Sequence, residues 1–288
     1  MNNEPTNPLR IAIPSKGRLE QPACDLLRQA GFRFERTERS LTVPVAGAPI
    51  ELLFVRTKDI PEMVADHVAD LGITGIDITR EQKIAVDVAL DLGFGRCSLI
   101  AAVPETSAIE SIEGFVGARI ATSHPVVVGD FFASKSIDTR LVPLSGSVEV
   151  APKLGIADAV VDLVSSGSTM LVNGLRPVVT ILESSAVLIE PCDSPRRTEA
   201  DMVVTMLTAA VAAKNRRYVV MNAPTSAIDK IAAIIPGLES PTVVPLTAKN
   251  MVAIHSVVDA ADVWRVLPAV KAEGATGILV LPVQQVLA

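Results

Sequence analysis

Short apolar runs alternate with amphipathic stretches along most of this chain, and Gly, Pro and polar turns separate them. Short apolar runs are typical of buried strands, whereas apolar residues that recur every three or four positions predict helices. The first part of the chain predicts the order β-α-β-β-α-β, with strands over 9–13, 41–45, 50–55 and 71–77 and helices over 19–30 and 61–70. This order favours a mostly parallel sheet that binds ligands at the carboxyl ends of its strands.

A second α/β unit is expected from about Cys97 onward. Its predicted strands cover 98–103, 118–122, 138–142, 157–161, 178–182 and 186–190. Its predicted helices are 126–136, a stretch from Glu149 with apolar Val150, Leu154 and Ile156, and 202–217. We expect a two-lobed body with a cleft, in which 1–97 and 186–215 form lobe I and 98–185 form lobe II.

The last part of the chain predicts a separate domain over 216–288. Apolar runs predict strands over 218–222, 241–246, 251–258 and 277–281, and helical patterns cover 224–235 and 262–273. The resulting β-α-β-β-α-β order is that of the ferredoxin-like arrangement. Such modules often pair sheet to sheet and bind small ligands between copies, but the fold alone does not assign that role.

Composition narrows the classes of partner. Of the 288 residues, 49% are hydrophobic and 20% charged, which supports a large core. The net charge of −6, without a basic stripe, argues against a nucleic acid as the main partner. The cysteines and histidines lack metal-ligand or disulfide spacing; they are Cys24, Cys97, Cys192, His67, His124 and His255. With no signal-peptide pattern at the N-terminus and no apolar run long enough to span a bilayer, a soluble, cytoplasmic protein is expected.

The segment 149–169 carries the most informative chemistry. Asp158 and Asp162, four residues apart, precede the run Ser165, Ser166, Gly167, Ser168 and Thr169. Acidic side chains can hold sugar hydroxyls, and a small Ser/Gly/Thr loop can wrap a phosphate with N–H and hydroxyl donors. A surface turn is the alternative, since such runs are usually turns. The predicted strand 157–161 places Asp162 and the loop at a carboxyl edge, which favours a pentose-phosphate site.

Two cationic turns also follow predicted strands. Lys16, Gly17 and Arg18 come after the first strand, and Arg56 and Lys58 come after the third. Turns of this kind at a sheet edge are natural anion sites. Solvated turns, or a structural salt bridge for Arg56, remain the alternatives.

In these segments the chain resembles the ATP phosphoribosyltransferase family in its long, histidine-regulated form, and the resemblance runs from about Leu9 to the C-terminus. The most specific match is 149–169, which is similar to the family's loop for phosphoribosyl pyrophosphate (PRPP). Four further segments match in the right order: 14–19, 56–60, 72–77 and 237–242. The resemblance implies a periplasmic-binding-protein-like catalytic body with a C-terminal ferredoxin-like (ACT-like) domain.

The resemblance also implies a reaction, the first step of histidine biosynthesis. Adenine N1 of ATP would displace pyrophosphate from C1 of PRPP, with Mg²⁺ on the pyrophosphate. Asp158 and Asp162 would serve the ribose and the Mg²⁺ environment, without any further direct protein ligand to the metal. The loop 165–169 would wrap the 5′-phosphate. The nucleotide and pyrophosphate would meet Lys16, Gly17, Arg18, Arg56, Lys58, Asp77 and His124.

Two positions depart from the family pattern. His124 stands where relatives often carry Tyr near the adenine, and it reads equally well as a half-buried hinge histidine. Asn222 stands where some relatives carry an Asp that faces the inhibitor histidine, so that attraction for the inhibitor's ammonium would weaken. The other residues expected around that effector are Leu238, Thr242, Val257 and Gly277. A homo-oligomer, dimers assembling into a hexamer, is expected.

Two other hypotheses compete with this enzyme. A two-lobed small-molecule binding protein without chemistry would fit the body equally well, but it would not require the acid-plus-phosphate loop, and a solute-binding protein would carry an export signal. The short form of the same family, which needs a partner subunit, is disfavoured by the domain from Tyr218 onward.

Overall fold

The computed structural model describes residues 7–37, 40–165, 170 and 172–287 of the chain. Contacts divide the chain into two compact units. The first unit holds 1–28 and 32–204, and the second holds 29–31 and 205–288. None of the helices in the described ranges is long and apolar enough to cross a membrane.

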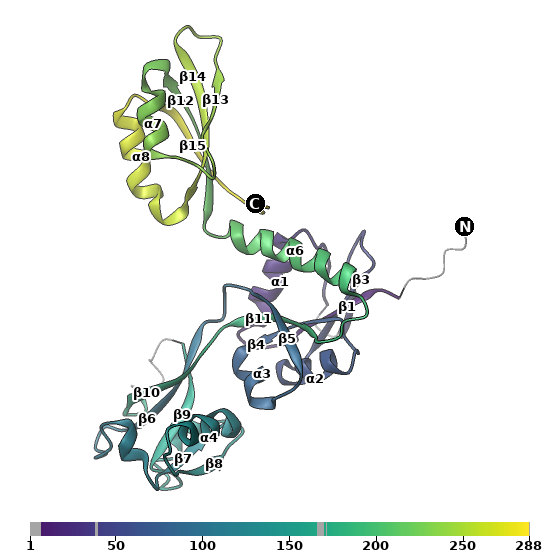
Figure 1. Cartoon of the computed structure of the whole chain (residues 1–288), viewed down its shortest axis with the longest axis vertical. Coiled ribbons are helices and arrows are strands. Elements are labelled where there is room, and N and C mark those ends of the chain that lie inside the picture. Colours follow the sequence, from purple (N-terminus) through teal and green to yellow (C-terminus); the bar gives the residue numbers. More distant parts are fainter. Residues whose placement is uncertain (1–6, 38–39, 166–169, 171, 288) are drawn as a thin grey trace. The chain divides into compact units, whose positions relative to one another are not determined.

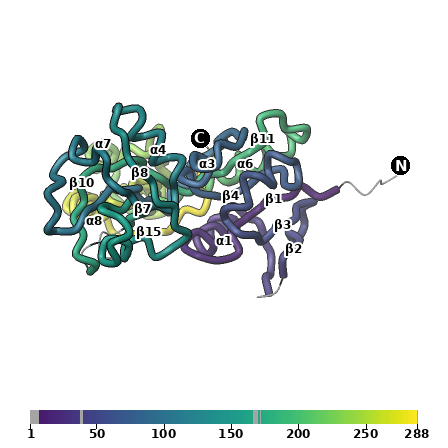
Figure 2. Tube along the Cα trace, turned by 90° about the horizontal axis from the view of Figure 1, so that it is seen from below, coloured from purple at the N-terminus to yellow at the C-terminus, as the bar shows by residue number. Residues whose placement is uncertain are grey.

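The first unit contains a six-stranded sheet of order β2-β3-β1-β4-β11-β5. Figure 1 labels most of its strands, and Figure 2 labels β2 beside β3. Its strands are β1 (Leu9–Pro14), β2 (Thr42–Pro44), β3 (Ile50–Val55), β4 (Leu71–Gly75), β5 (Val86–Asp91) and β11 (Ala186–Pro191). The helices of this region are α1 (Glu20–Gln29), α2 (Ile60–Ala65) and α3 (Ile76–Gln82). The central strands β4 and β11 are buried along their whole length, as their continuous apolar runs require.

The mostly parallel arrangement expected for the strands over 9–77 holds for the set β3-β1-β4, but the complete sheet is mixed. Strand β1 pairs in parallel with β3 and β4, but β2, β11 and β5 all run antiparallel to their neighbours. Apolar runs predict that a strand exists but not its direction, and β11 arrives only after the chain has built a second sheet. The parallel set β3-β1-β4 still places three strand ends at one edge.

The second sheet of this unit has the order β10-β6-β9-β7-β8. Its strands are β6 (Cys97–Pro104), β7 (Arg119–Thr122), β8 (Arg140–Pro143), β9 (Ala159–Val164) and β10 (Leu175–Ser184), and α4 (Pro125–Ser134) packs on it. Strands β8, β7 and β9 are parallel, so their carboxyl ends share an edge. The core beneath α4 includes Leu99, Phe115, Ile120, Phe132 and Val161.

Two sequence expectations in this sheet were wrong. The helix expected from Glu149 is only a 3₁₀ turn, η3 (Val148–Val150), followed by turns. Pro152 lacks an N–H donor and Gly155 adopts a φ of +69°, which together end any helix there. Asp162 lies inside β9 and not after it, because Leu163 and Val164 continue the strand.

The chain passes between the two sheets at two crossovers. It leaves the first sheet after β5 and enters β6 at Cys97, and it returns between Ser184, the last residue of β10, and Ala186, the first of β11. Cys97 and Ser184 are register partners in the β6–β10 pair. The two crossovers therefore lie side by side.

The second unit is a ferredoxin-like domain, as expected. Helix α6 (Arg197–Ala213) leads into it, and its sheet has the order β13-β14-β12-β15 with antiparallel neighbours. Its elements are β12 (Arg216–Pro224), α7 (Ile228–Ile234), β13 (Thr242–Pro245), β14 (Met251–Asp259), α8 (Val263–Ala272) and β15 (Thr276–Pro282). Helices α7 and α8 cover one face of this sheet, over a core that includes Met221, Ile231 and Ile254 (Figure 1).

Candidate active site

The carboxyl edge of the second sheet brings His124 and Asp162 to the same place. Thr122, the last residue of β7, pairs with Val161 of β9, so the residues that follow each of them lie at this edge. Asp162 is half-buried, and its side chain accepts a hydrogen bond from the Leu163 N–H at 2.8 Å. Burial raises the pKa of the Asp162 carboxyl and the charge of Glu149 raises it further, while the Leu163 N–H and His124 oppose the shift.

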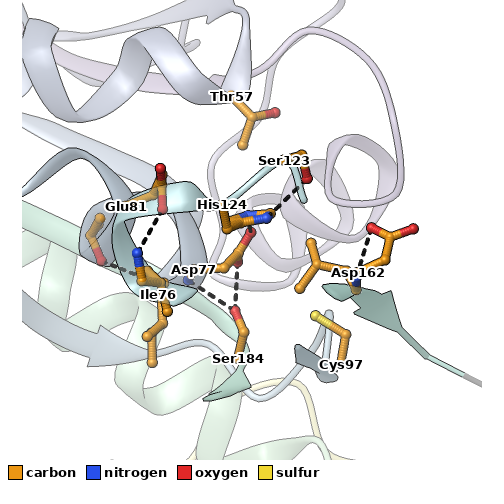
Figure 3. Close-up of polar contacts among 12 residues, drawn as sticks. Thr57, Ile76, Asp77, Glu81, Cys97, Ser123, His124, Asp162 and Ser184 are labelled. Carbon is orange, nitrogen blue, oxygen red and sulfur yellow. Dashed lines mark hydrogen bonds and ion pairs between the residues drawn. The ribbon is translucent and has the colours of Figure 1, made fainter. Parts of the chain in front are cut away.

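Asp77 occupies the first turn of α3, directly after the end of β4, and is 2% exposed. Its Oδ1 accepts a hydrogen bond from the Ser184 hydroxyl at 2.6 Å, and its Oδ2 lies 3.4 Å from His124 Nε2 (Figure 3). Burial alone would raise the pKa of Asp77. The hydrogen bonds from His124 and Ser184, with the charges of His124 and Arg18, outweigh burial and hold that pKa below its ordinary value.

Gly75 makes this position of the carboxylate possible. A Cβ on Gly75 would lie 2.2 Å from Asp77 Oδ1, which is closer than atoms can approach. A side chain at this strand end would therefore displace the carboxylate.

His124 joins the two sheets of the first unit. It lies just ahead of α4 and is 8% exposed. Its Nδ1 is 3.0 Å from Ser123 Oγ, and its backbone N–H donates to Thr122 Oγ1 at 3.0 Å. Because its Nε2 faces Asp77, the residue that the sequence placed near adenine bridges the β7 edge and the start of α3.

The two cationic turns expected at the first sheet come together. Pro14 at the end of β1 pairs with Val55 at the end of β3, so the turns that follow start at the same edge. Lys16, Gly17, Arg56, Thr57, Lys58 and Ile78 line a hollow of about 510 Å³. Gly17 has a φ of +88°, a conformation that glycine adopts without strain.

Arg18 differs from its two neighbours in the first turn. Its guanidinium donates to the Gly95 carbonyl at 2.5 Å and to Cys97 Sγ at 3.1 Å, at the first crossover. Its charge lowers the pKa of Asp77. The structure therefore places the Arg18 guanidinium beside the crossover and Asp77, not among the residues that line the hollow.

Asp158 does not join this group, contrary to the expectation of an acidic pair on one sugar. It precedes β9, and its carboxylate binds the Arg119 side chain at 2.8 and 3.1 Å and the Arg119 N–H at 2.9 Å. The hydrogen bonds from Arg119 hold its pKa below the ordinary value. Since a strand rises about 3.3 Å per residue, the six residues of β9 put roughly 20 Å between Asp158 and the loop after Val164.

The loop expected to wrap a phosphate is described only at its first residue. Ser165 is exposed and directly follows β9. Ser166, Gly167, Ser168 and Thr169 lie outside the described residues.

Sequence reasoning missed two polar side chains at this site. Ser184 binds Asp77, and Glu81 of α3 accepts hydrogen bonds from the N–H groups of Val126 and Val127 at 3.0 to 3.1 Å, in the first turn of α4. Neither residue stands in a motif. Their contacts arise from the folding together of distant segments, so no local signal could have found them.

The residues expected around an effector lie in the second unit. Asn222 on β12 and Val257 on β14 alternate with buried residues and so point to the sheet face opposite α7 and α8. Thr242 on β13 pairs with His255 of β14, which lies on the same face as Val257. Gly277 has a φ of +57°, and a Cβ there would lie 3.5 Å from Asn222 Nδ2. Leu238 is exposed in the turn before β13.

The fold and site define a class: an α/β protein with cationic turns after β1 and β3 and with the Asp77 and Asp162 carboxylates on either side of His124, followed by a ferredoxin-like domain. Comparison with models of known protein families identifies the family within this class. The model for ATP phosphoribosyltransferase (HisG) matches 56–209, and the model for its C-terminal domain matches 213–285. The chain belongs to the ATP phosphoribosyltransferase family, and the C-terminal domain identifies the long form.

Individual relatives agree with this assignment. The ATP phosphoribosyltransferase of Gemmatimonas aurantiaca is 41% identical over 97% of this chain and 99% of its own. That of Methanosarcina barkeri is 38% identical, also over 97% of this chain and 99% of its own. A solved ATP phosphoribosyl transferase (HisG:HisZ) complex from Thermotoga maritima has a TM-score of 0.58 and 31% identity, over 69% of this chain and 95% of the matched chain.

Proposed function

We propose that this protein transfers the phosphoribosyl group of PRPP to N1 of ATP and releases pyrophosphate, the first step of histidine biosynthesis. The observation that carries this proposal is the presence of one cationic and one acidic group of side chains in the first unit. Lys16, Arg56 and Lys58 supply positive charge around one hollow. Asp77 follows the end of β4 and Asp162 lies within β9, and the His124 side chain interacts with both carboxylates.

The reaction needs positioning and charge more than acid–base chemistry. Adenine N1 carries a lone pair and no proton when neutral, so it attacks C1 directly. As the bond to pyrophosphate breaks, positive charge develops on the ribose and negative charge on the leaving group. Asp162 stabilises the ribose cation, and the Lys16, Arg56 and Lys58 side chains neutralise the pyrophosphate.

The remaining groups orient the two substrates. Asp77 accepts a hydrogen bond from a ribose hydroxyl of ATP, and His124 stacks on or hydrogen-bonds the adenine. The loop 165–169 holds the 5′-phosphate of PRPP, as its resemblance to the family's PRPP loop implies. We leave Asp158 out of the site, because Arg119 occupies its carboxylate at the far end of β9.

The carboxylates fit a magnesium ion that arrives with substrate. Mg²⁺ is usually held by one or two carboxylates together with substrate phosphates. Asp162, with Glu149 near enough to raise its pKa, offers such oxygens, and no group of three His, Cys, Asp or Glu side chains among the described residues could hold the ion by itself. Bound Mg²⁺ would supply charge neutralisation on the pyrophosphate.

Regulation and assembly belong to the same proposal. Histidine inhibits the enzyme by binding at the open sheet face around Asn222, Thr242, Val257, Gly277 and Leu238. The enzyme works in the cytoplasm as a homo-oligomer. The match to the family's C-terminal domain supports the regulatory part.

A product assay tests the proposed reaction. The protein incubated with ATP, PRPP and Mg²⁺ should release pyrophosphate and give the absorbance change of an N1-substituted adenine. Omitting PRPP should give neither signal. Absence of both signals with PRPP present, across a range of Mg²⁺ concentrations, would exclude this reaction.

A further inference from the structure

Ser184 makes a two-point contact with Asp77. It is the last residue of β10, it lies at the second crossover, and it is 4% exposed. Its hydroxyl donates to Asp77 Oδ1 at 2.6 Å and accepts from the Asp77 backbone N–H at 3.1 Å (Figure 3). A hydroxyl has one hydrogen and two lone pairs, so it can make both bonds at once.

The contact follows from strand register. Strands β4 and β11 pair with Gly75 opposite Ala186, and one residue beyond, the Ile76 N–H donates to the Ser185 carbonyl at 3.1 Å. There α3 begins, and the first N–H groups of a helix have no partner within it. The Ser184 hydroxyl takes the next N–H, that of Asp77, and so continues the ladder with a side chain.

We propose that Ser184 is a positioning residue for the nucleotide: it fixes the Asp77 carboxylate so that its remaining lone pairs face the ATP ribose. This inference rests on the proposed function, which assigns Asp77 to that ribose. The bond to Oδ1 stops rotation of the carboxylate, and Oδ2 is left facing His124. Burial strengthens the restraint, because a hydrogen bond in a low dielectric is electrostatically stronger than one in water.

The crossover also positions Arg18, a second candidate substrate-binding residue. Ser184 pairs with Cys97 in the β6–β10 ladder, and Cys97 Sγ accepts a hydrogen bond from Arg18. The orientation of Asp77 and the position of the Arg18 guanidinium therefore both depend on the strands at the crossovers. A change in the geometry of these strands would move both the Asp77 carboxylate and the Arg18 guanidinium.

A simpler role for Ser184 is that of an ordinary helix cap. A cap would contribute to folding stability, and its loss would leave substrate affinity and pH dependence unchanged. A positioning residue would alter the ATP-dependent parameters even where the protein remains folded. The two roles are therefore separable by kinetics.

The experiment compares Ser184→Ala with Ser184→Thr, which keeps the hydroxyl. Ser98→Ala is the matched control, because Ser98 donates to the Glu183 carboxylate at 2.7 Å in the next pair of the same ladder, in an exposed place. Ser184→Ala should raise the KM for ATP about tenfold and leave the KM for PRPP within about twofold. Ser184→Thr should restore most of the loss, and Ser98→Ala should behave as the unmodified protein.

The pH profile gives a second readout. The charged and titratable groups that face Asp77 are His124 ahead of α4, Arg18 after β1 and Cys97 at the start of β6. None of them is replaced in the variant, but the loss of the Ser184 hydroxyl also removes a hydrogen bond that lowers the pKa of Cys97. Loss of the Ser184 donor removes one cause of the low Asp77 pKa. The acid limb of kcat/KM for ATP should therefore move to higher pH in Ser184→Ala.

A carboxyl titration of Asp77 by ¹³C NMR, with and without Ser184→Ala, separates this inference from the proposed function. A higher Asp77 pKa in the variant is expected whatever reaction the protein performs. An unchanged Asp77 titration, or an ATP KM and acid limb equal to those of the unmodified protein, would overturn the inference. An inactive protein in the product assay would overturn the proposed function, and the titration would still decide whether Ser184 fixes Asp77.

Discussion

Asp158 and Asp162 are four residues apart, yet their side chains differ in burial and in the charges around them. Asp158 is partly exposed and bound by Arg119 through side chain and backbone. Asp162 is half-buried beside Glu149, with one backbone N–H as its donor. The pKa of Asp158 is consequently lowered and that of Asp162 raised. One acidic pair in the sequence therefore becomes a structural residue and a candidate catalytic residue.

The opposite shifts predict opposite effects on stability. A raised Asp162 pKa means that the folded state binds this proton more tightly than the unfolded state, so stability falls as pH rises from the ordinary pKa through the raised one. Asp162→Asn should remove this fall. Asp158→Asn should instead remove stability that is present above the ordinary pKa and lost as pH falls through the lowered one. Urea unfolding between about pH 3 and 7 measures both, and variants with the same pH dependence would contradict the assignment.

Turnover should separate the same two residues. Asp162→Ala should lower kcat by roughly 10²-fold or more, since removal of one group that stabilises transition-state charge typically costs this much. Asp158→Ala should retain kcat within a few-fold while losing some stability. Circular dichroism establishes that each variant is folded. Equal losses of turnover in both variants would restore the acidic-pair hypothesis.

At the scale of elements, α3 and α4 meet through Glu81. Its carboxylate accepts from two N–H groups in the first turn of α4, which no residue of that helix satisfies. Glu81→Gln should lower the free energy of unfolding by about 1 kcal/mol, the usual effect of losing a helix cap.

The nearby Lys83–Asp130 ion pair provides the control for Glu81. It also joins α3 to α4, but both side chains are more than half exposed. Lys83→Gln should therefore change the unfolding free energy little, since exposed pairs contribute about 0–1 kcal/mol. A larger effect for Lys83→Gln than for Glu81→Gln would contradict this account.

Most strands and helices of the first unit could be predicted from the sequence, because their apolar periodicity is local. The direction of β11 and its place between β4 and β5 could not be predicted, since they depend on where the chain returns after the second sheet. The convergence of Lys16 with Arg56 followed from adjacent parallel strands and could be anticipated. The contact of Ser184 with Asp77 joins residues that are 107 positions apart in the chain, so it could not be anticipated.

At the scale of the whole molecule, the ferredoxin-like domain carries the candidate effector face, and Asn222 is its most informative residue. A carboxylate there would attract the ammonium of a histidine inhibitor. Because Asn222 is exposed, Asn222→Asp should lower the inhibitory concentration of histidine only a few-fold, corresponding to about 1 kcal/mol.

Histidine titrations in the product assay measure this change. Asn250→Asp, in an exposed turn of the same domain, is the control and should leave inhibition unchanged. If histidine inhibits neither the unmodified protein nor Asn222→Asp, the effector assignment of this face is refuted.

The pairing of Cys97 with Ser184 makes the second sheet a self-contained insertion in the first. Paired residues of antiparallel strands lie about 5 Å apart, so the inserted segment leaves and rejoins the first sheet at almost one point. Segments with adjacent ends can be exchanged or circularly permuted without stretching the host. The second sheet could thus diverge, or be replaced between relatives, as a single unit while the first sheet keeps its strands.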